Sequence, residues 1–330
     1  MTHKICIIKL GALGDVVRTT PILLGIKEKY PDAEITWITK PESLEILEDN
    51  PHIQQILTIP VEGIYETFDM LYNFDLEEEA LALASIIQAR EKFGYYNEEG
   101  FPAPFNSAAS YYLETTFSDE LKKTNKKTYQ EMMFEIAELE YKRQPCFFYL
   151  TDLDKRYADE FAKDNNLNTK KLVGINIGAS KRWPSKSWSV EKIKELIETL
   201  NKKGYEILLL GGRAEKDNIS ELINHFSEKD IRIFQNNVEN SIKQFASLIN
   251  LCKKVVSGDT MALHLAIALK KPTVGLFFCT SPDEIEDYGL LFKCISPMLK
   301  EFFPERSDQY DEKLVNSISS EQVFEALERV

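Results

Sequence analysis

At about 100–200 residues per domain, the 330 residues of this chain suggest two domains rather than one. Hydrophobic residues make up 43% and charged residues 28%, an ordinary globular composition that excludes wholesale disorder. The net charge of −13 is uneven, because residues 1–150 hold 14 Lys and Arg against 25 Asp and Glu, whereas 151–330 hold 26 against 28. This acidic first half argues against nucleic acid as a partner and against strong attraction to anionic lipid.

The first half alternates predicted strands and helices. An apolar run at 4–10 predicts a buried strand. The alternation of strands and helices that follows indicates a parallel sheet with helical crossovers. Residues 94–110 are aromatic, contain Pro and Gly and have no period, so we expect a long functional or mobile loop there. The predicted elements are strands at 4–10, 34–38 and 53–59, and helices at 16–30, 41–50 and 129–141.

The second half repeats this pattern. Its predicted strands lie at 171–178, 205–210, 254–257 and 273–278, and its helices at 189–202, 244–251 and 260–269. Two such arrays predict two doubly wound α/β domains facing each other across a cleft, with ligands outside the carboxyl ends of the strands. We place the domains at 1–150 and 171–330, with a linker at 151–170, and leave open that the C-terminal helix packs back on the first domain.

Targeting and redox signals are sparse. No apolar run is long enough to cross a bilayer, and the N-terminal run is interrupted by Lys9, so we expect no signal peptide. The five cysteines are scattered, without the spacing of a metal site, which indicates reduced cytoplasmic thiols and no metal. A cytoplasmic protein is therefore expected, with peripheral contact at the inner membrane left open.

The first candidate site is the loop KLGALGD at residues 9–15, directly after the first predicted strand. It lacks the GxGxxG spacing of a dinucleotide site, and no GxxxxGK[ST] loop occurs in the chain. What remains is Asp15 on a tight strand-to-helix turn. This carboxylate either caps the helix or serves as a general base at the edge of the sheet.

Three further candidates follow strands of the second half. Ser180 and Lys181 begin a loop whose cation suits a phosphate, and Glu215 follows Gly211-Gly212 where a carboxylate can accept from a ribose diol. Residues 257–264 (SGDTMALH) run from a strand into a helix whose free amides suit an anion. The alternatives are surface exposure for Glu215, a helix cap for Asp259 or Thr260, and a core histidine at 264. Each of these candidate loops lies at the carboxyl end of a predicted strand, which favours a functional site.

Taken in order, these motifs resemble glycosyltransferase family 9, the heptosyltransferase-like enzymes that use ADP-heptose in lipopolysaccharide core assembly. The resemblance covers nearly the whole chain. The matching residues are Lys9 to Asp15 with Thr19-Thr20-Pro21, Lys181-x-Trp183-Pro184, Gly211-Gly212 with Glu215, and Asp259-Thr260-x-x-x-His264. It implies a GT-B fold of two Rossmann-like domains, with the acceptor side first and the donor side second.

The resemblance also implies roles. Asp15 resembles the general base, Lys181 the cation that neutralises the departing diphosphate, and Glu215 the ribose ligand, without a bound metal or other cofactor. His264 matches a position near the donor and is not assigned the proton transfer. The expected donor contacts are Gly14, Ser180, Gly211, Glu215, Gly258, Asp259, Thr260, Met261 and His264, and the expected acceptor contacts are Lys9, Lys122, Lys123, Lys126, Lys127, Tyr95 and Tyr96.

Two features depart from the family. Met261 stands where glycine usually follows Asp-Thr, so a side chain there narrows the approach of the diphosphate to the backbone. The acidic first domain should repel the phosphorylated acceptors of well-known members. The lysines at 122–127 either provide a local exception or are a solvated face, in which case the acceptor is a less charged glycan. Tyr95 and Tyr96, in the aperiodic loop, are candidates for stacking on sugar rings or for ordinary packing.

We therefore expect an inverting, metal-independent glycosyltransferase that moves a sugar, most plausibly heptose, from an ADP-sugar to a bacterial surface glycan such as lipopolysaccharide core. Its partners would be a nucleotide sugar and a glycan or glycolipid acceptor. The alternatives are a GT-B enzyme with another donor and a non-lipopolysaccharide acceptor, a sugar-nucleotide epimerase, which four histidines support poorly, and a non-catalytic nucleotide-binding module.

Overall fold

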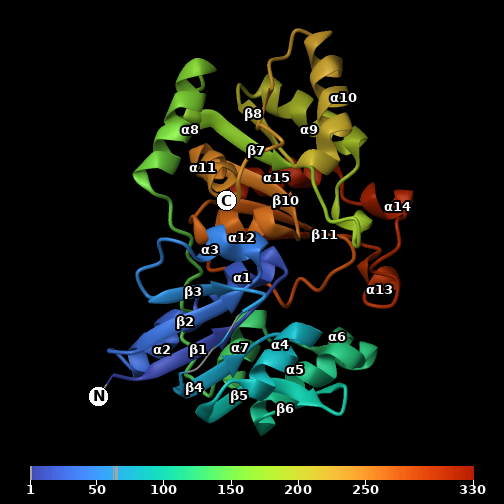
Figure 1. Ribbon diagram of the computed structural model, residues 1–330. Helices are drawn as coiled ribbons and strands as arrows, with labels where there is room; N and C mark the ends of the chain where they lie inside the picture. The colour runs from blue at the N-terminus through green and yellow to red at the C-terminus, as the bar shows by residue number, and fades with distance from the viewer. Residues whose placement is uncertain (1, 62, 64–65) are drawn as a thin grey trace. The chain divides into compact units, whose positions relative to one another are not determined.

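The computed structural model describes residues 2–61, 63 and 66–330, which form two compact units (Figure 1). Unit 1 comprises Met1–Tyr149 and Asp283–Glu286, and unit 2 comprises Leu150–Pro282 and Asp287–Val330. A short segment of the second half of the chain therefore belongs to unit 1. No helix among the described residues combines the length and apolarity that crossing a membrane requires.

The sheet of unit 1 has the strand order β3-β2-β1-β4-β5-β6. Its strands are β1 (Lys4–Ile8), β2 (Glu34–Thr39), β3 (Gln55–Thr58), β4 (Phe68–Asn73), β5 (Ala89–Glu98) and β6 (Phe101–Pro104). All pairings are parallel except that of β5 with β6. The order reverses between β1 and β4, so the loops that leave these two strands meet at the switch point where such sheets bind ligands.

Helices pack around this sheet. They are α1 (Leu13–Thr19), α2 (Ile22–Lys29), α3 (Leu44–Leu47), α4 (Glu78–Ile86), α5 (Ser107–Phe117), α6 (Asp119–Thr124) and α7 (Tyr129–Ile136), with a 3₁₀ turn at Pro41–Ser43. The single helix expected at 16–30 is two helices, because Pro21 has no N–H to continue the hydrogen-bond ladder after Thr20. The strand β4 and the helix α4 were not predicted.

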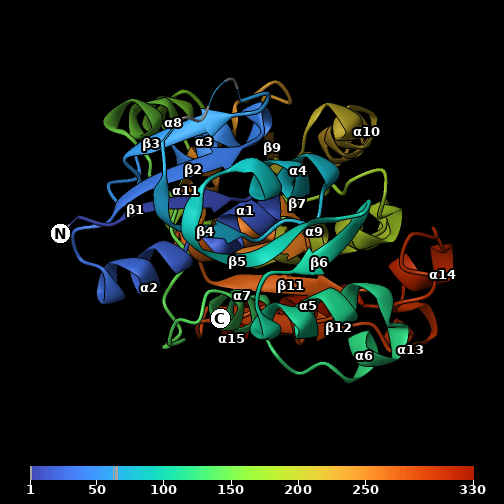
Figure 2. The ribbon, with the colours of Figure 1, turned by 60° about the horizontal axis from the view of Figure 1, so that its bottom comes forward.

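The prediction of a long aperiodic loop at 94–110 is wrong. The chain forms an antiparallel hairpin of β5 and β6 followed by α5, and Figure 2 shows β5 and β6 together. The prolines of β6 are tolerated because it is an edge strand. Gly94 has a φ of +91°, and a Cβ there would lie 1.8 Å from the carbonyl oxygen of Asn73, so the strand requires glycine at this point. Of its aromatic residues, Tyr95 is buried and Tyr96 stacks on Phe105, whereas Phe101 is 74% exposed.

The sheet of unit 2 has the order β12-β11-β10-β7-β8-β9, which is the strand order of unit 1, but all of its pairings are parallel. The strands are β7 (Leu172–Asn176), β8 (Glu206–Leu210), β9 (Phe234–Gln235), β10 (Lys254–Gly258), β11 (Thr273–Phe277) and β12 (Leu291–Ile295). Read from its first strand, each sheet has the order 3-2-1-4-5-6 of the dinucleotide-binding folds. Here the switch point lies between β7 and β10.

The helices of unit 2 include two that bear on the predicted boundaries. They are α8 (Asp152–Asp164), α9 (Val190–Lys202), α10 (Lys216–Ser227), α11 (Ile242–Leu251), α12 (Met261–Ala268), α13 (Leu299–Phe302), α14 (Glu312–Val315) and α15 (Ser320–Arg329). The expected linker contains α8, which starts at a Thr151–Asp154 capping box and packs on α11. The C-terminal helix α15 contacts α9, β11 and β12 of its own unit.

Candidate active-site loops

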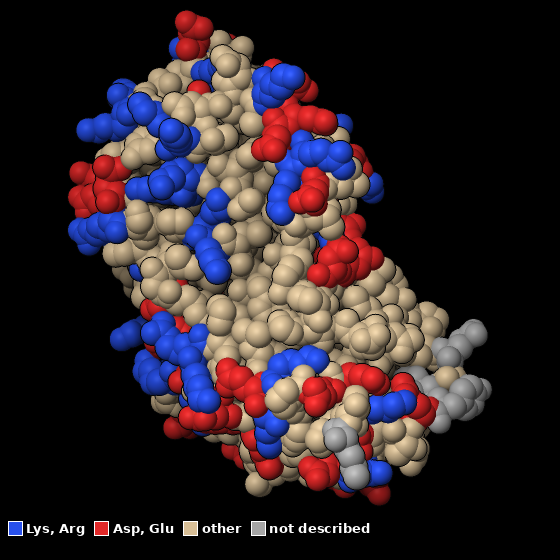
Figure 3. Space-filling model, turned by 90° about the vertical axis from the view of Figure 1, so that its left-hand side faces the viewer, with Lys and Arg blue, Asp and Glu red and all other residues tan. Residues whose placement is uncertain are grey.

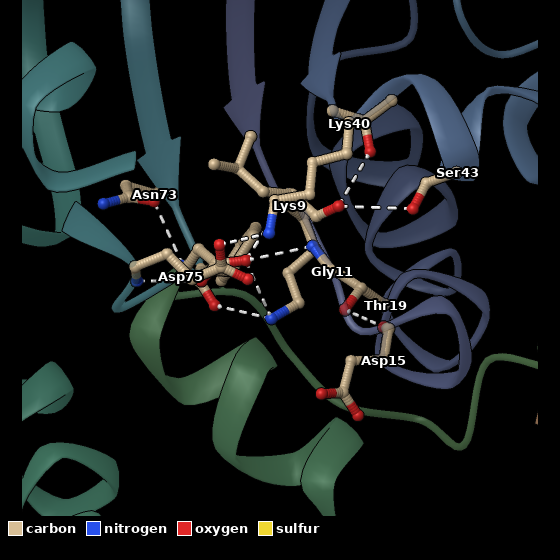
Figure 4. Close-up of polar contacts among 12 residues, drawn as sticks. Lys9, Gly11, Asp15, Thr19, Lys40, Ser43, Asn73 and Asp75 are labelled. Atoms are coloured by element: carbon tan, nitrogen blue, oxygen red, sulfur yellow. Dashed lines mark hydrogen bonds and ion pairs between the residues drawn. The ribbon is translucent and has the colours of Figure 1, made fainter. Parts of the chain in front are cut away.

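The loop after β1 is held by a buried ion pair at the switch point of unit 1 (Figure 4). Lys9 Nζ lies 3.2 Å from Asp75 Oδ2, and the two side chains are only 6% and 5% exposed. The same Asp75 oxygen accepts from the backbone N–H groups of Leu10, at 2.9 Å, and Gly11, at 3.3 Å. Asp75 follows β4, so one carboxylate joins the loops of both strands.

The opposite side of this loop is fastened to the end of β2. The carbonyl oxygen of Leu10 accepts from the hydroxyl of Ser43 at 3.2 Å and from that of Thr39 at 3.4 Å. Lys40 pairs with Glu77, whose own N–H donates to Asp75 Oδ1 at 3.1 Å. The N–H groups of Leu10 and Gly11 and the carbonyl oxygen of Leu10 therefore all have partners, which fixes the direction in which the loop enters α1.

Lys9 was expected to contact the acceptor, and the structure does not place it for this role. Burial by itself would lower its pKa, but the negative charges of Asp75 and Asp15 oppose that effect and the pKa of Lys9 is raised. The ammonium group is therefore retained as a structural charge. It supports the loop that carries the candidate base.

Asp15 lies in the first turn of α1, where the helix dipole favours negative charge. Its Oδ1 accepts from Arg18 Nε at 2.9 Å and lies 2.8 Å from Arg18 Nη2. The guanidinium carbon of Arg18 lies 4.0 Å from the ring centroid of Tyr129. The Asp15 side chain is 32% exposed, so its carboxylate is both oriented and accessible. Arg18 stands three residues after Asp15 in α1, a spacing that brings helical side chains together, whereas no local spacing indicates Tyr129 of α7.

Three of the four lysines at 122–127 pair with carboxylates of unit 1. Lys126 Nζ lies 2.8 Å from Asp283, Lys127 Nζ lies 2.6 Å from Glu135, and Lys122 Nζ lies 3.6 Å from Asp119. On the face of the molecule in Figure 3, basic and acidic side chains are likewise interspersed. The cluster is thus a set of neutralising pairs on α6 and the turn into α7.

The two candidate stacking tyrosines differ. Tyr95 is fully buried and its hydroxyl donates to the carbonyl oxygen of Ala109 at 3.0 Å, so it is a packing residue and not a sugar platform. Tyr96 stacks on Phe105, with ring centroids 4.7 Å apart, and donates to Glu98 at 2.9 Å. Strand alternation explains the difference, because neighbouring residues of β5 point to opposite faces.

In unit 2, the loops after β7 and β8 are close-packed through Glu215. Its Oε2 accepts from the N–H of Gly212 at 2.8 Å. A Cβ at Gly178 would lie 3.0 Å from the Glu215 carboxyl carbon, and one at Gly211 would lie 3.0 Å from Glu215 Cβ. Glycine at both positions therefore lets the glutamate lie across two strand ends. Ser180 and Lys181, farther along the β7 loop, are exposed.

Asp259, after β10, lies between Lys186 and His264. Lys186 Nζ is 2.9 Å from its Oδ2, and His264 Nε2 is 3.4 Å from its Oδ1. Gly258 allows this arrangement, since a Cβ there would lie 2.1 Å from the carbonyl oxygen of Lys186. His264 is buried at the first turn of α12, next to the carboxylate. Lys186 is a residue that the motif analysis missed.

A hydroxyl cluster joins the ends of β7 and β10. Asn176 Nδ2 donates to Thr260 Oγ1 at 3.1 Å and to Ser257 Oγ at 3.2 Å. Thr260 is the N-cap of α12 but makes no capping hydrogen bond with its own side chain, and Met261 is the first helical residue. The predicted donor segment 257–264 therefore contacts the carboxyl end of β7, where Asn176 is the last residue. A rule that treats every polar residue at the end of a predicted strand as a candidate would have found Asn176, but not Asp75, because the strand before it, β4, was not predicted.

The chain is similar to a known family and to several of its members. A family described as "Glycosyltransferase family 9 (heptosyltransferase)" matches residues 66–314. The "Lipopolysaccharide core heptosyltransferase OpsX" of Haemophilus influenzae is 23% identical over 313 residues, covering 89% of this chain and 84% of that protein. The "Lipopolysaccharide heptosyltransferase 1" of Campylobacter coli is 27% identical over 301 residues, covering 84% of each.

Solved structures share the fold. A glycosyl transferase family 9 protein from Veillonella parvula matches with a TM-score of 0.78 and 19% identity, over 99% of this chain and 96% of that one. The E. coli ADP-heptose lps heptosyltransferase II matches with a TM-score of 0.71 and 17% identity, over 99% and 98%. E. coli heptosyltransferase WaaC with ADP matches with a TM-score of 0.62 and 17% identity, over 99% and 97%. These likenesses confirm the predicted GT-B fold.

Proposed function

Because the chain belongs to glycosyltransferase family 9, we propose that it moves heptose from ADP-heptose to a lipopolysaccharide core acceptor, with inversion and without a metal ion. The names of its relatives support the acceptor class, and the ADP in the WaaC structure supports the donor. The observation that carries the proposal is Asp15, an accessible carboxylate oriented by Arg18 at the end of a rigidly held loop.

In this proposal Asp15 acts as the general base. It takes the proton of the acceptor hydroxyl while the oxygen attacks the anomeric carbon of the sugar. The bond from that carbon to the diphosphate breaks on the opposite face, which inverts the configuration. The ion pair with Arg18 orients the carboxylate, so that little motion is required at the moment of proton transfer.

The charge that develops on the leaving diphosphate would be stabilised from unit 2. Lys181 supplies a cation, and Ser180, Thr260 and the free amides at the start of α12 supply hydrogen-bond donors. Glu215 uses Oε2 to hold Gly212, and its other oxygen would accept from a ribose hydroxyl. The remaining donor contacts proposed are Gly14, Gly211, Gly258, Asp259, Met261 and His264.

The Asp15→Asn variant tests the base. We expect turnover to fall by about 10²–10⁴-fold, because general-base catalysis contributes that much, while ADP affinity stays within twofold. ADP release from ADP-heptose with a heptose-deficient lipopolysaccharide acceptor measures turnover, and calorimetry measures affinity. Glu42→Gln, an exposed carboxylate of the same unit, is the matched control and should keep full activity. Full activity of Asp15→Asn would refute the assignment.

A second candidate differs in the acceptor. The lysines that were to offset the acidic first half are paired with Asp119, Asp283 and Glu135, which favours a glycan with few phosphates. Transfer to dephosphorylated and phosphorylated forms of the same acceptor separates the two candidates. A higher kcat/KM for the dephosphorylated form supports this second one.

A further inference from the structure

A four-residue segment from the second half of the chain is built into unit 1. We call Asp283–Glu286 the strap; the chain before and after it belongs to unit 2. Lys126 Nζ lies 2.8 Å from Asp283, and the side chain of Ile285 is only 4% exposed. The carbonyl oxygen of Glu284 accepts from the N–H of Tyr129 at 2.9 Å. The strap is therefore bound through backbone, apolar and charged contacts.

Glu286 is the principal polar anchor of the strap. Its Oε1 accepts from Arg143 Nε at 3.1 Å and Nη2 at 2.7 Å, and its Oε2 accepts from the Tyr141 hydroxyl at 2.9 Å. The Glu286 side chain is 9% exposed and that of Arg143 is 59% exposed, so the carboxylate is shielded from water although the guanidinium reaches it, and a bidentate contact and a tyrosine hydroxyl hold the carboxylate. The Lys126–Asp283 pair is 75% and 45% exposed and holds the strap much less.

The strap completes the start of α7. The first N–H groups of a helix have no partner within the helix. Thr128 Oγ1 accepts from the N–H of Glu131 at 3.2 Å, whereas the N–H of Tyr129 goes to the strap at Glu284. Tyr129 is fully buried, so releasing the strap would leave an unpaired buried donor. The position of Tyr129 thus depends on the strap.

Tyr129 in turn supports the candidate base. Its ring lies under the Arg18 guanidinium at 4.0 Å, and its hydroxyl is 2.9 Å from Thr19 Oγ1. Arg18 holds Asp15 Oδ1 with two nitrogens. A continuous series of contacts therefore runs from Glu286 through the strap, Tyr129 and Arg18 to Asp15.

We propose that Glu286 is a positioning residue for catalysis, which fixes the orientation of Asp15 through the strap, Tyr129 and Arg18. The proposal rests on the proposed function of Asp15 as the base. It assigns to the second half of the chain a role in arranging the base of the first. The role is one of geometry, because Glu286 contacts Tyr141 and Arg143 rather than Asp15.

Kinetics of Glu286→Ala test this role. We expect kcat to fall about tenfold, because small misplacements of a reacting group are costly, while the KM for the sugar nucleotide and ADP affinity stay within twofold. Asp283→Asn, which removes only the exposed pair of the same strap, is the matched control and should keep kcat within twofold. If Glu286→Ala does not fold, Glu286→Gln keeps the side-chain volume, and we expect it to lower kcat about threefold.

A double-mutant cycle with Arg18→Gln distinguishes positioning from general destabilisation. In the Arg18→Gln background, Glu286→Ala should lower kcat less than twofold, because the path to Asp15 is already broken. Equal losses in both backgrounds, or an unchanged kcat in every folded Glu286 variant, would overturn the proposal. If Asp15→Asn retains activity, the proposed function itself fails; if Asp15→Asn is inactive and Glu286→Ala is not impaired, only the strap proposal fails.

Discussion

At the scale of single residues, the buried Lys9–Asp75 pair decides how the candidate base is presented. A buried charge is tolerated only with a partner and further hydrogen bonds, and Asp75 supplies both to the loop after β1. Removing one partner leaves the other charge buried and uncompensated. The pair therefore links the stability of unit 1 to the geometry of its functional loop.

We expect Lys9→Met to lower the free energy of unfolding by about 3–5 kcal/mol, because Asp75 loses its counter-charge. Urea denaturation measures the change. Arg90→Met removes an ion pair whose arginine is 79% exposed and should cost at most about 1 kcal/mol. Similar costs for the two variants would contradict a structural role for Lys9.

The pH dependence of this pair follows from the raised pKa of Lys9. The stability that the charged lysine contributes is fully present below the unfolded-state pKa of about 10.4 and is lost as the pH rises through the higher folded-state value. The difference in unfolding free energy between wild type and Lys9→Met should therefore stay constant from about pH 7 to 9 and shrink above about pH 10.4.

At the scale of elements, the end of β10 packs directly on the turn at Pro184–Lys186. This contact brings Lys186 to Asp259 and explains why β10 ends in glycine. Backbone lies against backbone there, so no flexible side chain can move away to accept an added methyl group.

We expect Gly258→Ala to lower the free energy of unfolding by about 1–3 kcal/mol through overpacking, and to weaken ADP binding as Asp259 shifts. Denaturation and calorimetry measure these effects. Gly212→Ala is the control for stability, because its added Cβ would lie 3.5 Å from the nearest atom, an ordinary contact. If Gly258→Ala is as stable as the wild type and binds ADP equally well, the turn at Pro184–Lys186 moves to accept the added methyl group and the prediction is wrong.

At the scale of the whole molecule, one strand order occurs twice with different residues in its loops. Both sheets have the same strand order, and each places its polar loops beside its switch point. Unit 1 uses its loop to present a carboxylate, whereas unit 2 presents a lysine, a helix start and a hydroxyl cluster. The proposed division is therefore proton removal in unit 1 and nucleotide binding in unit 2.

Calorimetric titration with ADP, UDP and GDP, without added metal, tests this division. We expect a preference for ADP and at least a tenfold weaker affinity in Lys181→Ala, because the diphosphate loses a charged partner. Lys202→Ala, an exposed lysine at the end of α9, is the control. A preference for UDP or GDP would keep the enzyme class but reject ADP-heptose as the donor.

The sequence by itself determined the two α/β arrays, most of their parallel strands and the loops where candidate residues gather. These features follow from local patterns of apolar residues, which report burial without knowledge of distant partners. The hairpin of β5 and β6 escaped that analysis because its prolines and aromatic residues obscure the alternation of an edge strand.

Only the tertiary structure decided which long-range partners each residue meets. Lys9 is paired with a carboxylate 66 positions away, Tyr95 points into the core, and the strap reaches unit 1 from the second half of the chain. These outcomes depend on strand order and on the face that each strand buries, which no local pattern encodes. Asp15 was therefore a candidate base from the sequence and Arg18 lies three residues along the same helix, whereas only the fold brought Tyr129 and Asp75 to them.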